Sequence, residues 1–133
     1  MLVIALFGAT LGSPAAGAPA TPCRGVDRGL PADFVASVSP EIAKQLGVPS
    51  VRVQQSFHYG RWRVLYVRPL AYEDVFLFYS DVPTAQHFIT EWSGAAAKFE
   101  GASIRKWVVQ NAPGIPAKLA GCFAWRVTVD RDM

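Results

Sequence analysis

The chain has 133 residues, enough for one ordinary domain and too few for two. Its formal charge is only +3, which gives weak support for a polyanion as partner. No charged side chain occurs in the first twenty residues, so all 13 Lys and Arg and all 10 Asp and Glu belong to residues 21–133. The remaining composition is that of an ordinary globular domain.

Residues 1–20 predict a cleavable signal peptide. Residues 2–11 are an apolar run too short to cross a bilayer as a helix, and small residues and prolines follow it. The small-x-small pattern of Ala18-Pro19-Ala20 favours cleavage after Ala20. We therefore expect export to the periplasm or the extracellular space, no membrane insertion after cleavage, and a single mature domain over residues 21–133. The alternative is an apolar helix that stays on the domain, and because no basic residue precedes the apolar run, a start upstream of Met1 is also left open.

The two cysteines, Cys23 and Cys122, predict one disulfide. An isolated pair usually bonds in an oxidising compartment. Their wide spacing, with no C-x-x-C motif, argues against a redox or metal role. The bridge would tie the mature N-terminus to the last predicted element.

The first half of the domain predicts a helix followed by a hairpin. Ser39-Pro40 is typical of a helix N-terminus and Gly47 of its end, with another helical turn possible in residues 30–38. Apolar residues then alternate with polar ones over residues 51–58 and 61–68, which indicates two strands.

A turn at Tyr59-Gly60 would place Phe57 opposite Trp62. In that register the apolar residues of both strands share one face of the sheet.

The second half predicts two more strands and two more helices. Residues 75–80 are apolar on both faces, as in a central or doubly covered strand. Apolar residues recur at helical spacing over residues 82–92 and again over residues 103–111. Residues 122–129 alternate as a fourth strand. The expected fold is α+β, a four-stranded, mostly antiparallel sheet with helices packed on one face.

Motifs for the common chemistries are absent from the sequence. Neither a phosphate-binding glycine loop nor a nucleophile elbow occurs, so we expect no cofactor. With both cysteines in the bridge, only His58 and His87 remain as strong metal ligands, and we expect no metal site. On the predicted helix, His87 and Glu91 lie one turn apart but face away from the core, which is typical of a solvated surface.

The polar side of the predicted hairpin is the candidate binding surface. Six side chains should project from it: Arg52, Gln54, Ser56, His58, Arg61 and Arg63. Such a surface suits a protein or an anionic envelope polymer, whereas nucleic acid is not expected, because no nucleic-acid-binding motif accompanies the arginines. The plainer interpretation is that these six side chains form the solvent-exposed face of an antiparallel sheet and bind no partner.

Three functions follow from these features. The first is an exported non-enzymatic protein that binds another macromolecule, such as an inhibitor, immunity or accessory protein. The second is a small-ligand-binding domain, with a pocket between sheet and helices lined by Tyr66, Phe78, Tyr79 or Trp92. The third is a small hydrolase that uses His58 or His87. The oligomeric state is left open.

Overall fold

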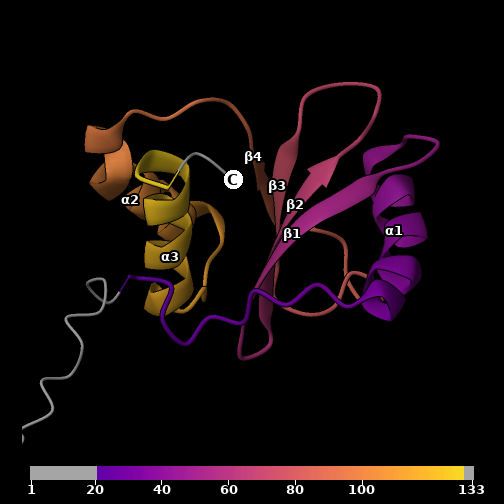
Figure 1. Ribbon diagram of the computed structural model, residues 1–133, viewed down its shortest axis with the longest axis horizontal. Helices are drawn as coiled ribbons and strands as arrows, with labels where there is room; N and C mark the ends of the chain where they lie inside the picture. Colours follow the sequence, from indigo (N-terminus) through magenta and orange to yellow (C-terminus); the bar gives the residue numbers. More distant parts are fainter. Residues whose placement is uncertain (1–20, 131–133) are drawn as a thin grey trace, which may run out of the picture.

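The computed structural model describes residues 21–130, so the predicted signal peptide lies outside the described residues. The strands of one sheet pair antiparallel in chain order (Figure 1). No helix in the described range is long and apolar enough to cross a bilayer. The elements are α1 (Ala32–Leu46), β1 (Arg52–Tyr59), β2 (Trp62–Arg68), β3 (Val75–Tyr79), β4 (Thr90–Trp92), the 3₁₀ helix η1 (Lys98–Glu100), α2 (Gly101–Asn111) and α3 (Ala117–Thr128).

The sheet lies between two helical layers, with α1 on one face and α2 with α3 on the other (Figure 1). The α+β class and the four-stranded antiparallel sheet are therefore confirmed, but the helices cover both faces instead of one. The reason lies in β3, whose five side chains are all buried. Leu77 and Tyr79 pack on the α1 side, whereas Phe76 and Phe78 pack on the α2 and α3 side.

Helix α1 is one continuous helix, longer than residues 39–46. Ser39 lies inside it, and its hydroxyl donates to the Val35 carbonyl oxygen at 2.6 Å. Gly47 ends the helix in the left-handed region at φ 68°, as expected for a C-terminal glycine. The prediction of helical structure here is confirmed, but Ser39 is not its N-cap.

The β1–β2 hairpin is confirmed, but its register differs by two residues from the expected one. Tyr59 pairs with Trp62, so the turn is Gly60-Arg61, and Gly60 takes the positive φ of 61° that such a turn favours. A β-bulge lies between Val53 and Gln55, where the register shifts.

Because of this bulge, the apolar residues of β1 do not share one face. Val53 packs on the α1 side, and Phe57 packs on the α3 side.

The helix predicted for residues 82–92 is wrong. The segment is a loop that ends in the short strand β4, which pairs with β3. Side-chain amides hold the loop: Gln45 donates to the Pro83 and Gln86 carbonyl oxygens at 3.0 and 2.9 Å. Gln86 in turn accepts from the backbone N–H groups of Ser80 and Asp81. These contacts satisfy the backbone without helical hydrogen bonds.

The strand predicted for residues 122–129 is also wrong, because residues 122–128 belong to α3 and Val129 caps it. Leu119, Phe123 and Val127 follow a spacing of four and pack on the sheet, as helical periodicity requires. Ala120 and Ala124, strong helix formers, support this conformation. The helix expected over residues 103–111 is confirmed as part of α2.

The predicted Cys23–Cys122 disulfide is confirmed and joins residues 99 positions apart. It fixes the start of residues 21–31 on α3, from where this segment runs to α1 (Figure 1). On the way, Asp27 and His58 exchange backbone hydrogen bonds of 2.8 Å, so the segment lies along the free edge of β1.

Candidate functional site

The structure does not bring the six predicted binding residues onto one exposed face. Ser56 is fully buried, and the Arg63 guanidinium lies 4.2 Å from the centre of the Phe34 ring in α1. Helix α1 covers this face of the hairpin. The predicted fold, with helices on one face of the sheet only, left it open to solvent.

The other predicted members are dispersed. Gln54, at the bulge, donates to Asp74 at 3.0 Å. His58 is half-buried with Nδ1 4.0 Å from the Asp27 carboxylate. Arg52 is exposed near one end of the hairpin, and Arg61 is exposed at the turn. A role in partner binding stays a prediction for these two arginines.

The second histidine, His87, is also apart from any candidate catalytic group. It is exposed in the loop before β4, and its Nδ1 lies 2.8 Å from the Phe88 carbonyl oxygen. Because the predicted helix is absent, His87 and Glu91 are not one helical turn apart. Within the described range, no cluster of three or more His, Cys, Asp or Glu side chains is placed to hold a metal ion.

A cavity of about 150 Å³ lies between the sheet and α3. Aromatic side chains from three strands form one wall: Tyr66 in β2, Phe76 in β3 and Trp92 in β4. Tyr66 and Phe76 stack with ring centroids 4.3 Å apart, and Trp92 lies 6.0 Å from Phe76. The remaining lining is formed by Gly94, Ala95, Ala96, Arg126 and Val127.

Arg126, in α3, is the charged side chain of this cavity, and it is only 4% exposed. Its Nη1 donates to the Asp130 carboxylate at 2.8 Å and also to the Asp130 carbonyl oxygen. Its Nη2 has one long contact, 3.5 Å, to Oε1 of Gln55, and its buried Nε has no hydrogen-bond partner among residues 21–130. The Nε and Nη2 groups of this buried guanidinium therefore make fewer hydrogen bonds to the described residues than they could.

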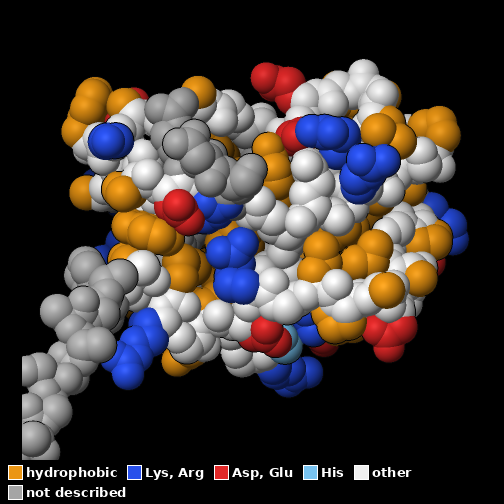
Figure 2. All heavy atoms as spheres, in the orientation of Figure 1, with side chains coloured by type: hydrophobic (Ala, Val, Ile, Leu, Met, Phe, Trp, Pro, Cys, Tyr) orange, Lys and Arg blue, Asp and Glu red, His pale blue; other side chains and the backbone are white. Residues whose placement is uncertain are grey.

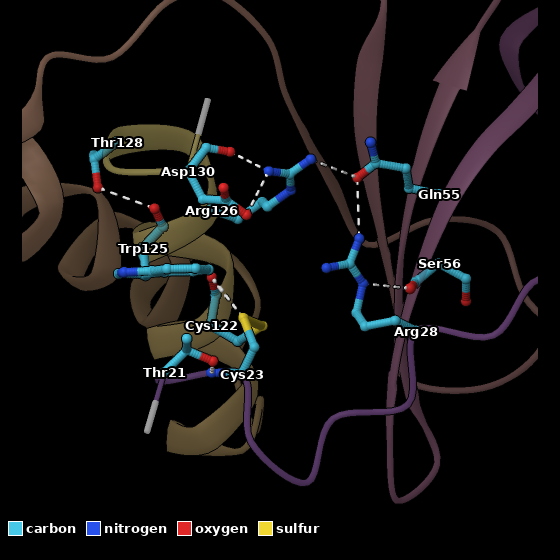
Figure 3. The surroundings of a disulfide bond; sticks show 10 residues. All are labelled: Thr21, Cys23, Arg28, Gln55, Ser56, Cys122, Trp125, Arg126, Thr128 and Asp130. Carbon is cyan, nitrogen blue, oxygen red and sulfur yellow. Dashed lines mark hydrogen bonds and ion pairs between the residues drawn. A yellow bond between two sulfur atoms is a disulfide. The ribbon is translucent and has the colours of Figure 1, made fainter. Parts of the chain in front are cut away.

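A second arginine, Arg28, reaches the same amide oxygen (Figure 3). Its Nη2 donates to Gln55 Oε1 at 3.1 Å and its Nε to the Ser56 carbonyl oxygen at 3.0 Å. The guanidinium also lies 3.6 Å from the centre of the Phe57 ring. Partial burial lowers the pKa of Arg28 below its ordinary value, and the positive charge of Arg126 lowers it further, whereas the negative charge of Asp130 partly opposes this shift.

Two cations thus converge on one neutral acceptor in the space between α3 and the sheet. On the face of the molecule that Figure 2 displays, basic side chains lie near the middle, with an acidic side chain beside them.

Sequence reasoning missed Arg28, Gln55 and Arg126. In a regular strand, the Gln55 side chain would face the same side of the sheet as Val53, which is the α1 side. The bulge turns Gln55 to the α3 side. Arg126 lies within residues 122–129, which were predicted as a strand, but it belongs to α3. A helical interpretation of its surrounding alanines would have placed Arg126 near the sheet.

Two predicted pocket residues, Tyr66 and Trp92, do line the cavity, whereas Phe78 and Tyr79 do not. Phe78 lies in the core beneath α2 and α3, and Tyr79 packs on the opposite face.

No family model, curated protein or solved structure matches the chain.

Proposed function

We propose that this protein is an exported binding protein whose ligand is a small molecule held between the sheet and α3. The cavity walled by Tyr66, Phe76 and Trp92, with buried Arg126 at its side, carries this proposal. Ligand sites generally combine apolar and aromatic walls with a few fixed polar groups, and this cavity has that composition.

The cavity is open to solvent on one side, so its size limits only the part of the ligand that lies inside it. A volume of about 150 Å³ is that of a cavity known to accept a single benzene ring. The ligand, or the part of it that enters, is therefore about one ring in size. The stacked Tyr66 and Phe76 rings offer a flat ligand an aromatic surface.

The alternatives have less support. A hydrolase built on a histidine would need His58 or His87 near the cavity, and neither lines it. A macromolecule-binding face on the hairpin would need its polar residues on one exposed surface, but Ser56 is buried and Arg63 packs on α1. Export is supported by the disulfide, since such bonds persist mainly in oxidising compartments.

The test is a screen of neutral and charged single-ring compounds against the mature protein, by thermal shift and by protein-observed NMR. Ala96 lines the cavity and is buried, so Ala96→Leu should fill it and abolish binding. Its neighbour Ala97 does not line the cavity, so Ala97→Leu is the matched control and should keep binding. Binding that survives Ala96→Leu, or no binding of any single-ring compound to the wild type, would contradict the proposal.

A further inference from the structure

Among the described residues, the Asp130 carboxylate is the acidic group beside the two arginines of the cavity, so two positive charges face one negative charge. In the described part of the chain, Asp130 is the carboxylate bonded to Arg126, and Arg28 has no carboxylate partner. Both guanidinium groups contact Gln55 Oε1, so they lie close together. Arg126 is buried and Arg28 is exposed, so water screens part of their mutual repulsion, and an anion placed between them removes the rest.

The orientation of Arg126 fits a carboxylate. The Nε and Nη2 groups form the side edge of a guanidinium, and a carboxylate accepts from both in a bidentate pair. On Arg126 these are the two underused groups, because Nε has no partner and Nη2 has only the 3.5 Å contact to Gln55. Asp130 occupies Nη1, so it leaves this edge free.

Gln55 takes the position that a ligand oxygen would occupy. Its amide oxygen is a neutral acceptor between two cations, at 3.1 Å from Arg28 Nη2 and 3.5 Å from Arg126 Nη2 (Figure 3). Gln55 is half-buried at the bulge, and its cross-strand partner Tyr66 lines the cavity. The charged position is therefore adjacent to the aromatic one.

We infer that the ligand is a small flat carboxylate whose ring lies in the cavity and whose carboxylate replaces Gln55 Oε1 between Arg28 and Arg126. This inference rests on the proposed function. It adds the chemical class of the ligand, an aromatic or similarly planar monocarboxylate about one ring in size.

The test compares benzoate with benzamide, a neutral molecule of the same shape, by calorimetric titration of the mature protein. We expect the wild type to bind benzoate at least tenfold more tightly than benzamide. Arg28→Gln should weaken benzoate at least tenfold and leave benzamide unchanged. Arg105, exposed on α2, supplies the control, because Arg105→Gln changes the net charge equally but should alter neither affinity.

Gln55→Glu gives a second variant that does not depend on removing an arginine. Its carboxylate should bind both guanidinium groups, raise the melting temperature without ligand, and weaken benzoate at least tenfold. Equal affinities of the wild type for benzoate and benzamide, or a lower melting temperature of Gln55→Glu, would overturn the carboxylate inference and leave the pocket standing. If neither compound binds to the wild type, the inference fails together with the proposed single-ring pocket.

Discussion

The disulfide should supply a large part of the stability of this domain. Replacing both Cys23 and Cys122 with alanine opens a loop whose ends are 99 positions apart. For a loop of that length the lost chain entropy corresponds to about 4.7 kcal/mol at 25 °C. A domain of this size is stable by only about 5–15 kcal/mol, so the double variant should be close to unfolding.

Equilibrium unfolding in urea, followed by far-UV circular dichroism, measures this effect. The double variant should unfold with a free energy lower by about 4–5 kcal/mol and with a larger denaturant slope, because its unfolded chain is more expanded. Wild-type protein in reductant serves as the control, since it loses the cross-link but keeps both sulfur atoms. A loss below about 1 kcal/mol would refute the loop-closure reasoning. A difference of more than about 1.5 kcal/mol between the double variant and the reduced wild type would assign the effect to side-chain packing instead.

Three further changes test the core and the sheet. Phe123→Ala should cost about 3–5 kcal/mol, because the ring lies 5.0 Å from both Phe76 and Phe78; a loss below about 1 kcal/mol in urea unfolding would contradict the packing of α3 on the sheet. Ser56→Ala should leave the unfolding free energy unchanged or raise it by about 1–2 kcal/mol, since the buried hydroxyl has no hydrogen-bond partner in the described part of the chain; a marked loss would reveal a hydrogen bond there. The hydrogen bond from Arg68 lowers the pKa of Asp74 below its ordinary value of 3.8, so its contribution to stability is present above that pH and is lost as the pH falls below it. Asp74→Asn should therefore reduce the acid dependence of urea unfolding, and an unchanged dependence would contradict this assignment.

Local signals in the sequence were sufficient where one pattern dominated. The hairpin strands, the buried strand β3 and helix α2 follow from periodicity, and the Cys23–Cys122 bridge follows from an isolated cysteine pair. For β3, apolar residues on both faces indicated a central or doubly covered strand, although the predicted fold placed the helices on one face only.

Sequence reasoning failed where long-range contacts determine the conformation. Residues 82–92 have helical spacing, but Gln45, far away in α1, hydrogen-bonds the Pro83 and Gln86 carbonyl oxygens. Residues 122–129 fit both periods, and burial against the sheet decides for the helix. The arginine site was missed for the same reason, since it needs Arg28 from the segment before α1, Gln55 from β1 and Arg126 from α3.

The β-bulge in β1 can be tested directly, because it positions Gln55 at the arginine site. Val53 pairs with Val67 and Gln55 with Tyr66, so Gln54 is the extra residue of the strand. Its deletion would make Val53 and Gln55 neighbours on opposite faces, where they already lie.

We therefore expect the Gln54 deletion to fold and to cost about 1 kcal/mol, mainly for its lost hydrogen bond to Asp74. Deletion of Ser56 is the matched control. It would make Gln55 and Phe57 neighbours, although both now face α3, and one of them would have to turn to the other face. Phe57 is fully buried and would keep its place, so Gln55 would turn into the position of Ser56, which is fully buried opposite Leu65. Overpacking and the burial of a polar amide there should cost about 2–5 kcal/mol in urea unfolding. Equal losses from the two deletions would contradict the placement of the bulge, and with it the reason why Gln55 faces Arg126.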